Sequence, residues 1–251
     1  MNKIVIVDDK TSEKKINDNI EYHIETYDSL FSITNVKIEI SGEETLYFYL
    51  RATDKKYKIQ VDINSDVCSN VYIFENVENS KVQYSFTVLE KSNLNVRHFN
   101  KNINSKQMIE SNLIGEDSSF NYQIRKICHN KETNDFYIHH CGNNSYSNLT
   151  GDIASLTGAS VSTQISTFVE EECIGANTTQ SLNILKFNDS KTELKPNLYI
   201  DNNSAIISHD NNILNISDFV ENDFMLSEIY DKDLREALTS FIERIGVVED
   251  E

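Results

Sequence analysis

The sequence contains no tryptophan, one proline and seven glycines among its 251 residues. Sheet proteins built from many hairpins use glycine and proline at their reversing turns. Because this chain has so few of them, Asn, Asp and Ser must form its turns, which they can do through side-chain-to-backbone hydrogen bonds and tolerance of left-handed backbone. Such residues suffice for corners, so the composition favours a β-solenoid over a sandwich or barrel.

Basic residues are fewer than acidic ones. The chain has 23 Lys and Arg and 40 Asp and Glu, which gives a formal net charge of −17. Contact with nucleic-acid phosphates needs a clustered Lys/Arg surface, and none is visible in the sequence. The same charge argues against docking on an anionic membrane. We therefore expect neither nucleic acid nor a membrane as a partner, while an ATPase with a basic face is compatible with this charge.

Long apolar runs are absent as well. No stretch approaches the run of about 18 apolar residues that spans a membrane, and the N-terminus lacks the apolar segment and cleavage site of a signal peptide. The chain is too long and too regular for a disulfide scaffold, so we expect reduced thiols in a cytoplasmic protein. The four cysteines are Cys68, Cys128, Cys141 and Cys173.

Short segments of alternating apolar and polar residues follow one another through most of the chain, as in Phe120–Ile127. Such alternation is typical of strands with one buried face. It predicts a mainly β protein with a β-helix (solenoid) core over residues 36–215, preceded by an N-terminal segment over residues 1–35. The predicted strands are Val36–Ile40, Thr45–Leu50, Tyr57–Ile63, Ser69–Phe74, Val82–Val88, Leu94–Phe99, Gln107–Leu113, Phe120–Ile127, Asp135–His139, Ser147–Ile153, Ser160–Phe168, Gln180–Leu185, Asn197–Ile200 and Ala205–Ser208.

The pattern changes after residue 215. Apolar residues of Ile216–Ile245 recur at spacings of three and four, which predicts a small C-terminal helical region over residues 216–251. Ser217 or Asp218 is the expected N-cap of a first helix and Asp231 that of a second. The apolar stripe is long for so small a region, and this leaves room for a partner surface beside ordinary core packing.

A series of motifs occurs in a fixed order from His140 to Phe241. Its members are His140–Ser147, Gly151–Ile153, Ala159–Gln164, Gln180–Leu185, Lys195–Ile200, Ser208–His209, Asp223–Leu226 and Ala237–Phe241. In order and spacing these residues resemble the SufB/SufD family of iron–sulfur cluster assembly scaffold proteins, as a short, divergent, SufD-like member would. The single proline, Pro196, falls on the family's proline.

The resemblance implies a non-enzymatic scaffold that pairs with a SufB/SufD-like subunit, as a homo- or heterodimer, and docks a SufC-like ABC-type ATPase through its C-terminal helices. It implies that His209 helps to hold a transient iron–sulfur cluster at the subunit junction, as cofactor and metal ligand. A neutral imidazole can ligate iron. The implied partner-binding residues are Phe224, Met225, Leu226, Ala237 and Phe241.

Three departures from the family pattern leave other functions open. Ser181 stands where SufB-type members carry a cysteine, Asp210–Asn212 replaces Gly-Ala-Thr, and Ser227–Tyr230 replaces Ser-Arg-Gly. One alternative is a β-helix enzyme acting on polysaccharides, which needs carboxylates stacked on one face and is disfavoured by the lack of tryptophan. Another is a structural or interaction solenoid without cluster chemistry.

Other soft ligands lie at Cys128-His129 and His139-His140-Cys141. Their spacing does not match a zinc site, although residues one coil apart could stack in a solenoid. His139 and His140 must point to opposite faces of a strand, so at most one can join a given site. Cys173 follows three glutamates that disfavour a reactive thiolate. Cys68 is expected to be a buried strand residue.

Overall fold

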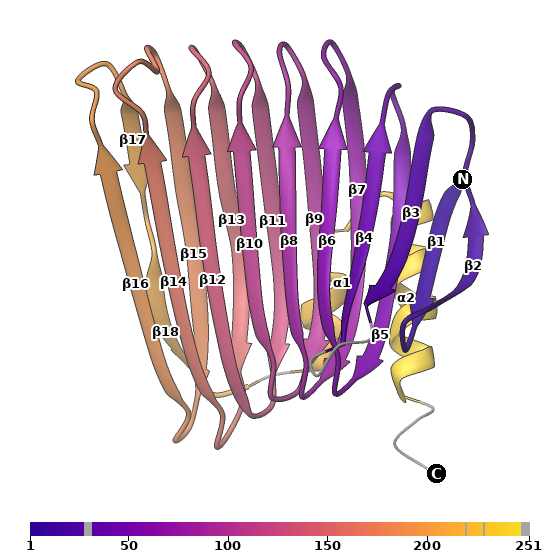
Figure 1. The fold of residues 1–251 in the computed structure, drawn as a ribbon. Helices are drawn as coiled ribbons and strands as arrows, with labels where there is room; N and C mark the ends of the chain where they lie inside the picture. Colours follow the sequence, from indigo (N-terminus) through magenta and orange to yellow (C-terminus); the bar gives the residue numbers. More distant parts are fainter. Residues whose placement is uncertain (28–31, 219, 228, 247–251) are drawn as a thin grey trace.

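The computed structural model describes residues 1–27, 32–218, 220–227 and 229–246. Its chain winds into a β-solenoid of about seven turns, in which two facing sheets run the length of the molecule (Figure 1). Sheet A has the order β17 (Ile206–His209), β15 (Asn177–Phe187), β13 (Tyr146–Ser155), β11 (Ser119–Cys128), β9 (Asn93–Asn102), β7 (Cys68–Glu78), β5 (Thr45–Thr53), β1 (Asn2–Val7), β2 (Lys10–Lys15), with β18 (Asn212–Ile216) also beside β15. Sheet B has the order β16 (Lys191–Ile200), β14 (Ser160–Val169), β12 (Lys131–His140), β10 (Lys106–Leu113), β8 (Lys81–Val88), β6 (Lys56–Ile63), β4 (Ile33–Ile40), β3 (Ile20–Tyr27).

Each coil contributes one strand to each sheet, and consecutive coils pair in parallel register. Leu46 pairs with Val71 and Val71 with Val96, so the first full coils are 25 residues long. The coils lengthen toward the C-terminus, where Leu149 pairs with Gln180 at a separation of 31 residues. Thirteen of the fourteen predicted strands lie wholly within observed strands, and the last differs by one residue.

The corners explain how the chain turns with few glycines and a single proline. Asn and Asp residues with positive φ recur at equivalent corners, for example Asp54 (φ 57°), Asn79 (φ 48°) and Asn104 (φ 53°). Asx residues tolerate this left-handed backbone better than other non-glycine residues. The predicted role of polar residues as corners is therefore confirmed, and it is the physical basis of the low glycine count.

The N-terminal segment is part of the solenoid. β1 pairs in parallel with β5, and its other side is covered by the antiparallel strand β2. β3 likewise lies antiparallel to β4 at the end of sheet B. Both sheets therefore end in a reversed strand at this side of the molecule, and these reversals close the first coil.

Inward-facing side chains of the two sheets form one continuous core. In the first coils it includes Phe48, Ile73 and Phe86, which are at most 1 % exposed. Burial of such apolar surface is the main driving force for folding. The alternation that predicted the strands is thus the alternation between this core and the outer faces.

Two helices cover part of the outer face of sheet A (Figure 1): α1 (Glu221–Leu226) and α2 (Lys232–Gly246). Asp231 caps α2, because its Oδ1 accepts a hydrogen bond from the Leu234 amide at 2.7 Å; this prediction is confirmed. The prediction of Ser217 or Asp218 for the first helix is wrong, since α1 begins at Glu221 without a side-chain cap. Neither described helix is long and apolar enough to cross a membrane.

Candidate functional site at the open end of the solenoid

The C-terminal end of the solenoid is open. β16 is the last strand of sheet B, and β17 and β18 end sheet A, so no described strand pairs with their outer edges. Such edges expose unpaired backbone groups that can accept another strand. Apolar side chains are also exposed there, namely Leu198, Tyr199, Ile200, Ile206, Ile213 and Leu214.

His209 lies at this open end. It is the last residue of β17 and pairs with Gln180 of β15, which is completely buried inside the preceding coil. Since the same row of sheet A contains the buried residues Tyr122 and Leu149, the register places His209 on the inner side of the last coil. His209 is nevertheless exposed, because no further coil covers it.

The residues around His209 do not complete a metal site within this chain. Over the described residues, no group of three or more His, Cys, Asp or Glu side chains is arranged to hold a metal ion. An imidazole can ligate a metal, and His209 is exposed at this end as a single possible ligand.

His140 and Cys141 do not converge on His209. The His140 ring is buried and lies 2.8 Å from both Ser145 Oγ (through Nδ1) and Ser147 Oγ (through Nε2). Burial lowers the pKa of His140 to about 4, with a smaller contribution from neighbouring His139. Its two ring nitrogens are thus engaged within the core, which makes it a structural residue.

His139 points outward, as its neighbour points inward, and this confirms that the two histidines cannot share a site. Its ring stacks on Phe168 at a centroid distance of 4.7 Å, and Phe168 stacks on Tyr199 at the same distance. Face-to-face ladders of this kind fill the space between neighbouring strands. The ladder ends at Tyr199 on the open edge.

The four cysteines are free thiols, and among them Cys128 lies near the buried ammonium group of Lys126. Burial raises the pKa of Cys128 and, with Glu170 nearby, that of Cys173. Burial and a hydrogen bond to Glu170 raise the pKa of Cys141 to about 11. The expected unreactive thiol at Cys173 is consistent with this environment.

The expectation that Cys68 is buried is wrong. It is the first residue of β7, where its side chain is exposed, while Ser69 faces the core. The alternation of the strand requires that either Cys68 or Ser69 faces the core, and the corner at Asp66 determines that it is Ser69. A slip of one residue reverses the face.

The interior holds a buried polar network that the sequence patterns did not predict. Glu75 Oε2 accepts a hydrogen bond from Tyr84 at 2.5 Å and lies 3.4 Å from His98 Nε2. Asn102 and Gln107 donate to Glu75 Oε1 at 2.6 and 3.0 Å. Burial alone would raise the pKa of Glu75, but these donors and His98 lower it below its usual value.

A buried ion pair lies one coil further along. Lys126 Nζ is 3.1 Å from Glu132 Oε2 and donates to Asn134 Oδ1 at 2.7 Å, and both charged side chains are completely buried. Neither network is accessible to a substrate, so both are structural. The signal that could have revealed them is the register, because their residues share inward-facing rows of successive coils.

The predicted partner-binding residues lie on α1 and α2 and face the solenoid. Met225, Ala237 and Phe241 are at most 9 % exposed, and the Phe241 ring packs against Phe74 of β7 at 5.5 Å. Phe224 and Leu226 are partly buried in the same cluster. With the helices docked in this way, the apolar stripe is covered by sheet A, and the exposed face of the helices is polar.

Arg125 of β11 fastens α1 to the sheet. Its guanidinium donates to the carbonyl oxygens of Phe224, Met225 and Ser227. Glu221, at the start of α1, lies 3.2 Å from Lys101. The helices are thus held by polar contacts as well as by apolar packing.

No protein-family model matches this chain, and a search of curated proteins finds no significant match. The likeness to SufB/SufD scaffolds therefore rests on the motifs in the sequence.

Proposed function

We propose that this protein is a non-enzymatic component of a SUF-type iron–sulfur cluster assembly scaffold, working in the cytoplasm. In this role it pairs with a SufB/SufD-like subunit at the open end of its solenoid and docks a SufC-like ATPase on its C-terminal helical region. The cluster is the cargo, held transiently between the two subunits with His209 as one ligand.

The observation that carries the proposal is the place of His209. It lies on the inner side of an uncovered last coil, beside edge strands with exposed apolar side chains. A second solenoid set against these edges would bury His209 and bring its own ligands to it. This arrangement would supply the ligands that the described part of this chain lacks.

The ATPase surface is proposed on the exposed face of α2 while the apolar stripe stays on sheet A. Asp233 and Glu236 are exposed there, with Glu236 69 % accessible. Lys232 and Arg235 are exposed on α2 as well, but together with Glu243 the carboxylates outnumber them, and such a face is complementary to an ATPase with a basic surface. Release of the helices from the sheet would offer the apolar stripe as well.

Co-purification with a SufC-type ATPase tests the proposal. We expect the full chain to retain the ATPase and a truncation before Ile216 to lose it. Asp233→Lys/Glu236→Lys should weaken retention, whereas Lys56→Glu/Lys58→Glu on sheet B should not. Failure of the intact protein to bind would exclude the proposed scaffold role.

Anaerobic reconstitution with iron and sulfide, in the presence of a SufB/SufD-like partner, tests the cluster site. His209→Ala is expected to lower cluster loading, measured by absorbance and bound iron, while His139→Ala keeps it. Tyr199→Lys/Ile213→Lys should prevent pairing in analytical ultracentrifugation, because like charges on the edges oppose strand addition. Unchanged loading in the His209 variant would remove this residue from the site.

The second candidate is an interaction solenoid without cluster chemistry. It is favoured by the isolation of His209 from other described metal ligands and by Ser181 in place of the family's cysteine. In that case the protein would pair through its open end and bind the ATPase, yet reconstitution would load no iron with any partner.

A further inference from the structure

We infer that the outer face of sheet B carries a docking site for an acidic amphipathic helix of a partner protein. The site is a basic strip made of Lys56, Lys58, Lys81, Lys106 and Lys131. It lies on a different sheet from the C-terminal helices, so it goes beyond the proposed scaffold function.

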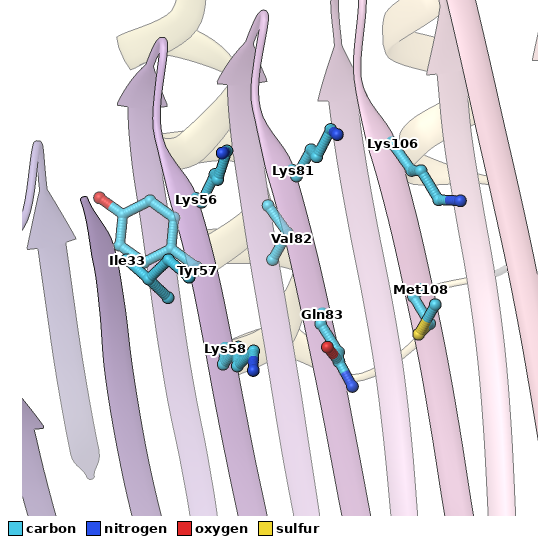
Figure 2. Close-up of a pocket in the computed structure, with 9 residues that line it drawn as sticks. All are labelled: Ile33, Lys56, Tyr57, Lys58, Lys81, Val82, Gln83, Lys106 and Met108. Carbon is cyan, nitrogen blue, oxygen red and sulfur yellow. The ribbon is translucent and has the colours of Figure 1, made fainter. Parts of the chain in front are cut away.

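The strip is built by the register of the solenoid. Lys56 pairs with Lys81 and Lys81 with Lys106, so three ammonium-bearing side chains form a row across β6, β8 and β10 (Figure 2). Lys58 lies one pleat further along β6, and Lys131 begins β12. Four of these lysines are the first residues of their strands, and they are 25 residues apart in the sequence. Because they are so far apart, a search for clusters of neighbouring basic residues does not find them.

The strip contrasts with the charge of the whole molecule. The hollow in Figure 2 is lined by nine residues that include four lysines and no carboxylate, in a chain of net charge −17. A second hollow shares Lys81 and Lys106 and adds Lys131, again without a carboxylate. Lys106 is 3.0 Å from Asp135, whereas Lys58, Lys81 and Lys131 form no ion pair with any residue that the structure describes.

A small apolar floor lies between the lysines. Met108 and Ile33 are partly exposed and line the hollow (Figure 2), whereas the side chains of Tyr57 and Val82 beside them point into the core. An apolar floor with a charged rim is the pattern that binds amphipathic helices in grooves. A ligand for this site should therefore carry both apolar and acidic side chains.

The spacing of the row selects a helix over an extended peptide. Neighbouring strands are about 4.8 Å apart, so three lysines span about 10 Å. Carboxylates on one face of an α-helix recur about every 5.4 Å, whereas those of an extended strand recur about every 6.6 Å. Flexible lysine side chains absorb the small mismatch with the helix.

The negative charge of the molecule also selects a short ligand. A long polyanion, such as a duplex or a membrane surface, would extend beyond the strip over acidic regions of this chain. A helix of a few turns would contact the strip alone. Hence a protein helix is favoured over nucleic acid or anionic lipid.

The test uses the full chain and a fluorescein-labelled helix-forming peptide of about 18 residues, with leucines along one stripe and glutamates beside it. Fluorescence anisotropy should show binding that weakens with added salt, because exposed charges are screened. Lys81→Glu/Lys106→Glu should weaken binding about tenfold or more. Lys15→Glu/Lys232→Glu lies away from the strip, changes the net charge equally and should leave the affinity within about twofold.

All four lysines are exposed, so neither double variant is expected to unfold, and circular dichroism checks this. Absence of peptide binding, or equal weakening in both variants, would overturn the inference. It would also be overturned if a DNA duplex or phosphatidylserine vesicles bound through Lys81 and Lys106 while the peptide did not.

Discussion

The early and late coils of this solenoid share the same parallel strand pairing but have different interiors. One inward-facing row of sheet B passes from Thr34 through Tyr57 and Val82 and continues with Gln107, Asn134 and Thr163, all buried. The apolar members gain stability from transfer out of water, while the polar ones need hydrogen-bond partners to offset their burial. Parallel pairing thus fixes the shape of a coil and leaves the chemistry of its interior free to change.

The two ends of the solenoid also differ, in the charge and the apolar exposure of their edge strands. At the N-terminal end the edge strand β2 is Lys-Thr-Ser-Glu-Lys-Lys, with no buried residue, and its charges discourage further pairing. At the C-terminal end, Tyr199 is 51 % and Ile206 64 % exposed. One end is covered by a charged strand, and the other exposes apolar side chains at its edge strands.

The largest effect is expected from the buried ion pair of the late coils. Glu132→Ala leaves Lys126 charged and unpaired in the core and should lower the free energy of unfolding by about 3–5 kcal/mol. Urea denaturation measures it. The double variant Lys126→Met/Glu132→Met removes both charges and should recover most of this loss; equal instability of the single and double variants would contradict the argument.

Truncation of an apolar side chain in the early coils should cost somewhat less. Ile59 is 2 % exposed in the main core, and Ile59→Ala is expected to destabilise the protein by about 2–5 kcal/mol through lost burial and a cavity. The exposed neighbour Lys58→Ala should change stability by no more than about 0.5 kcal/mol. A small effect at Ile59 would show that the early core is loosely packed.

The pH dependence of stability should come partly from His140 in the late coils. Its folded pKa of about 4 lies below the usual value of 6.5, so the unfolded state binds its proton more readily. Stability is therefore lost as the pH falls from about 6.5 to about 4, by roughly 2–3 kcal/mol from this group.

Urea denaturation of the wild type and of His140→Gln across this pH range measures the contribution of His140. The variant should show a flatter profile than the wild type. If the wild type and His140→Gln lost stability equally with falling pH, His140 would not contribute to the pH dependence of the free energy of unfolding.

Substitutions at the corners should have the smallest effect on stability, and the effect should be similar in the early and the late coils. Asn104 (φ 53°) and Asn188 (φ 43°) belong to an early and a late corner. Replacement of either by Ala should cost about 1 kcal/mol, because Ala disfavours left-handed backbone, and replacement by Gly should cost less. Thermal unfolding compares them, and a much larger loss at one corner would mean that its side-chain contacts dominate.

Local patterns in the sequence were sufficient for the strands and corners, because each depends on a few neighbouring residues. They did not show where a second layer covers the outer face of the sheet. Phe74, Phe99 and Ile127 face α1 and α2 rather than solvent, so both faces of these strands are buried and the alternation disappears.

The sites depend on residues that only the coiling brings together. Glu75 and His98 are more than twenty positions apart, and the same holds for successive lysines of the basic strip. His209 was singled out by its motif, but its exposure depends on the missing next coil. Only the register could show which of these side chains meet.

The constant 25-residue step from Leu46 to Val96 makes the early part of the chain divisible into interchangeable units. If one such unit were removed, each strand and each corner of the coil before it would meet the equivalent strand and corner of the coil after it. Duplicating one would lengthen the molecule by one strand spacing and extend the row of lysines by one. The 25-residue coil is therefore the unit in which the length of the molecule can change. A surface that spans several coils, such as the row of lysines, can grow or shrink by one coil at a time while the fold stays the same.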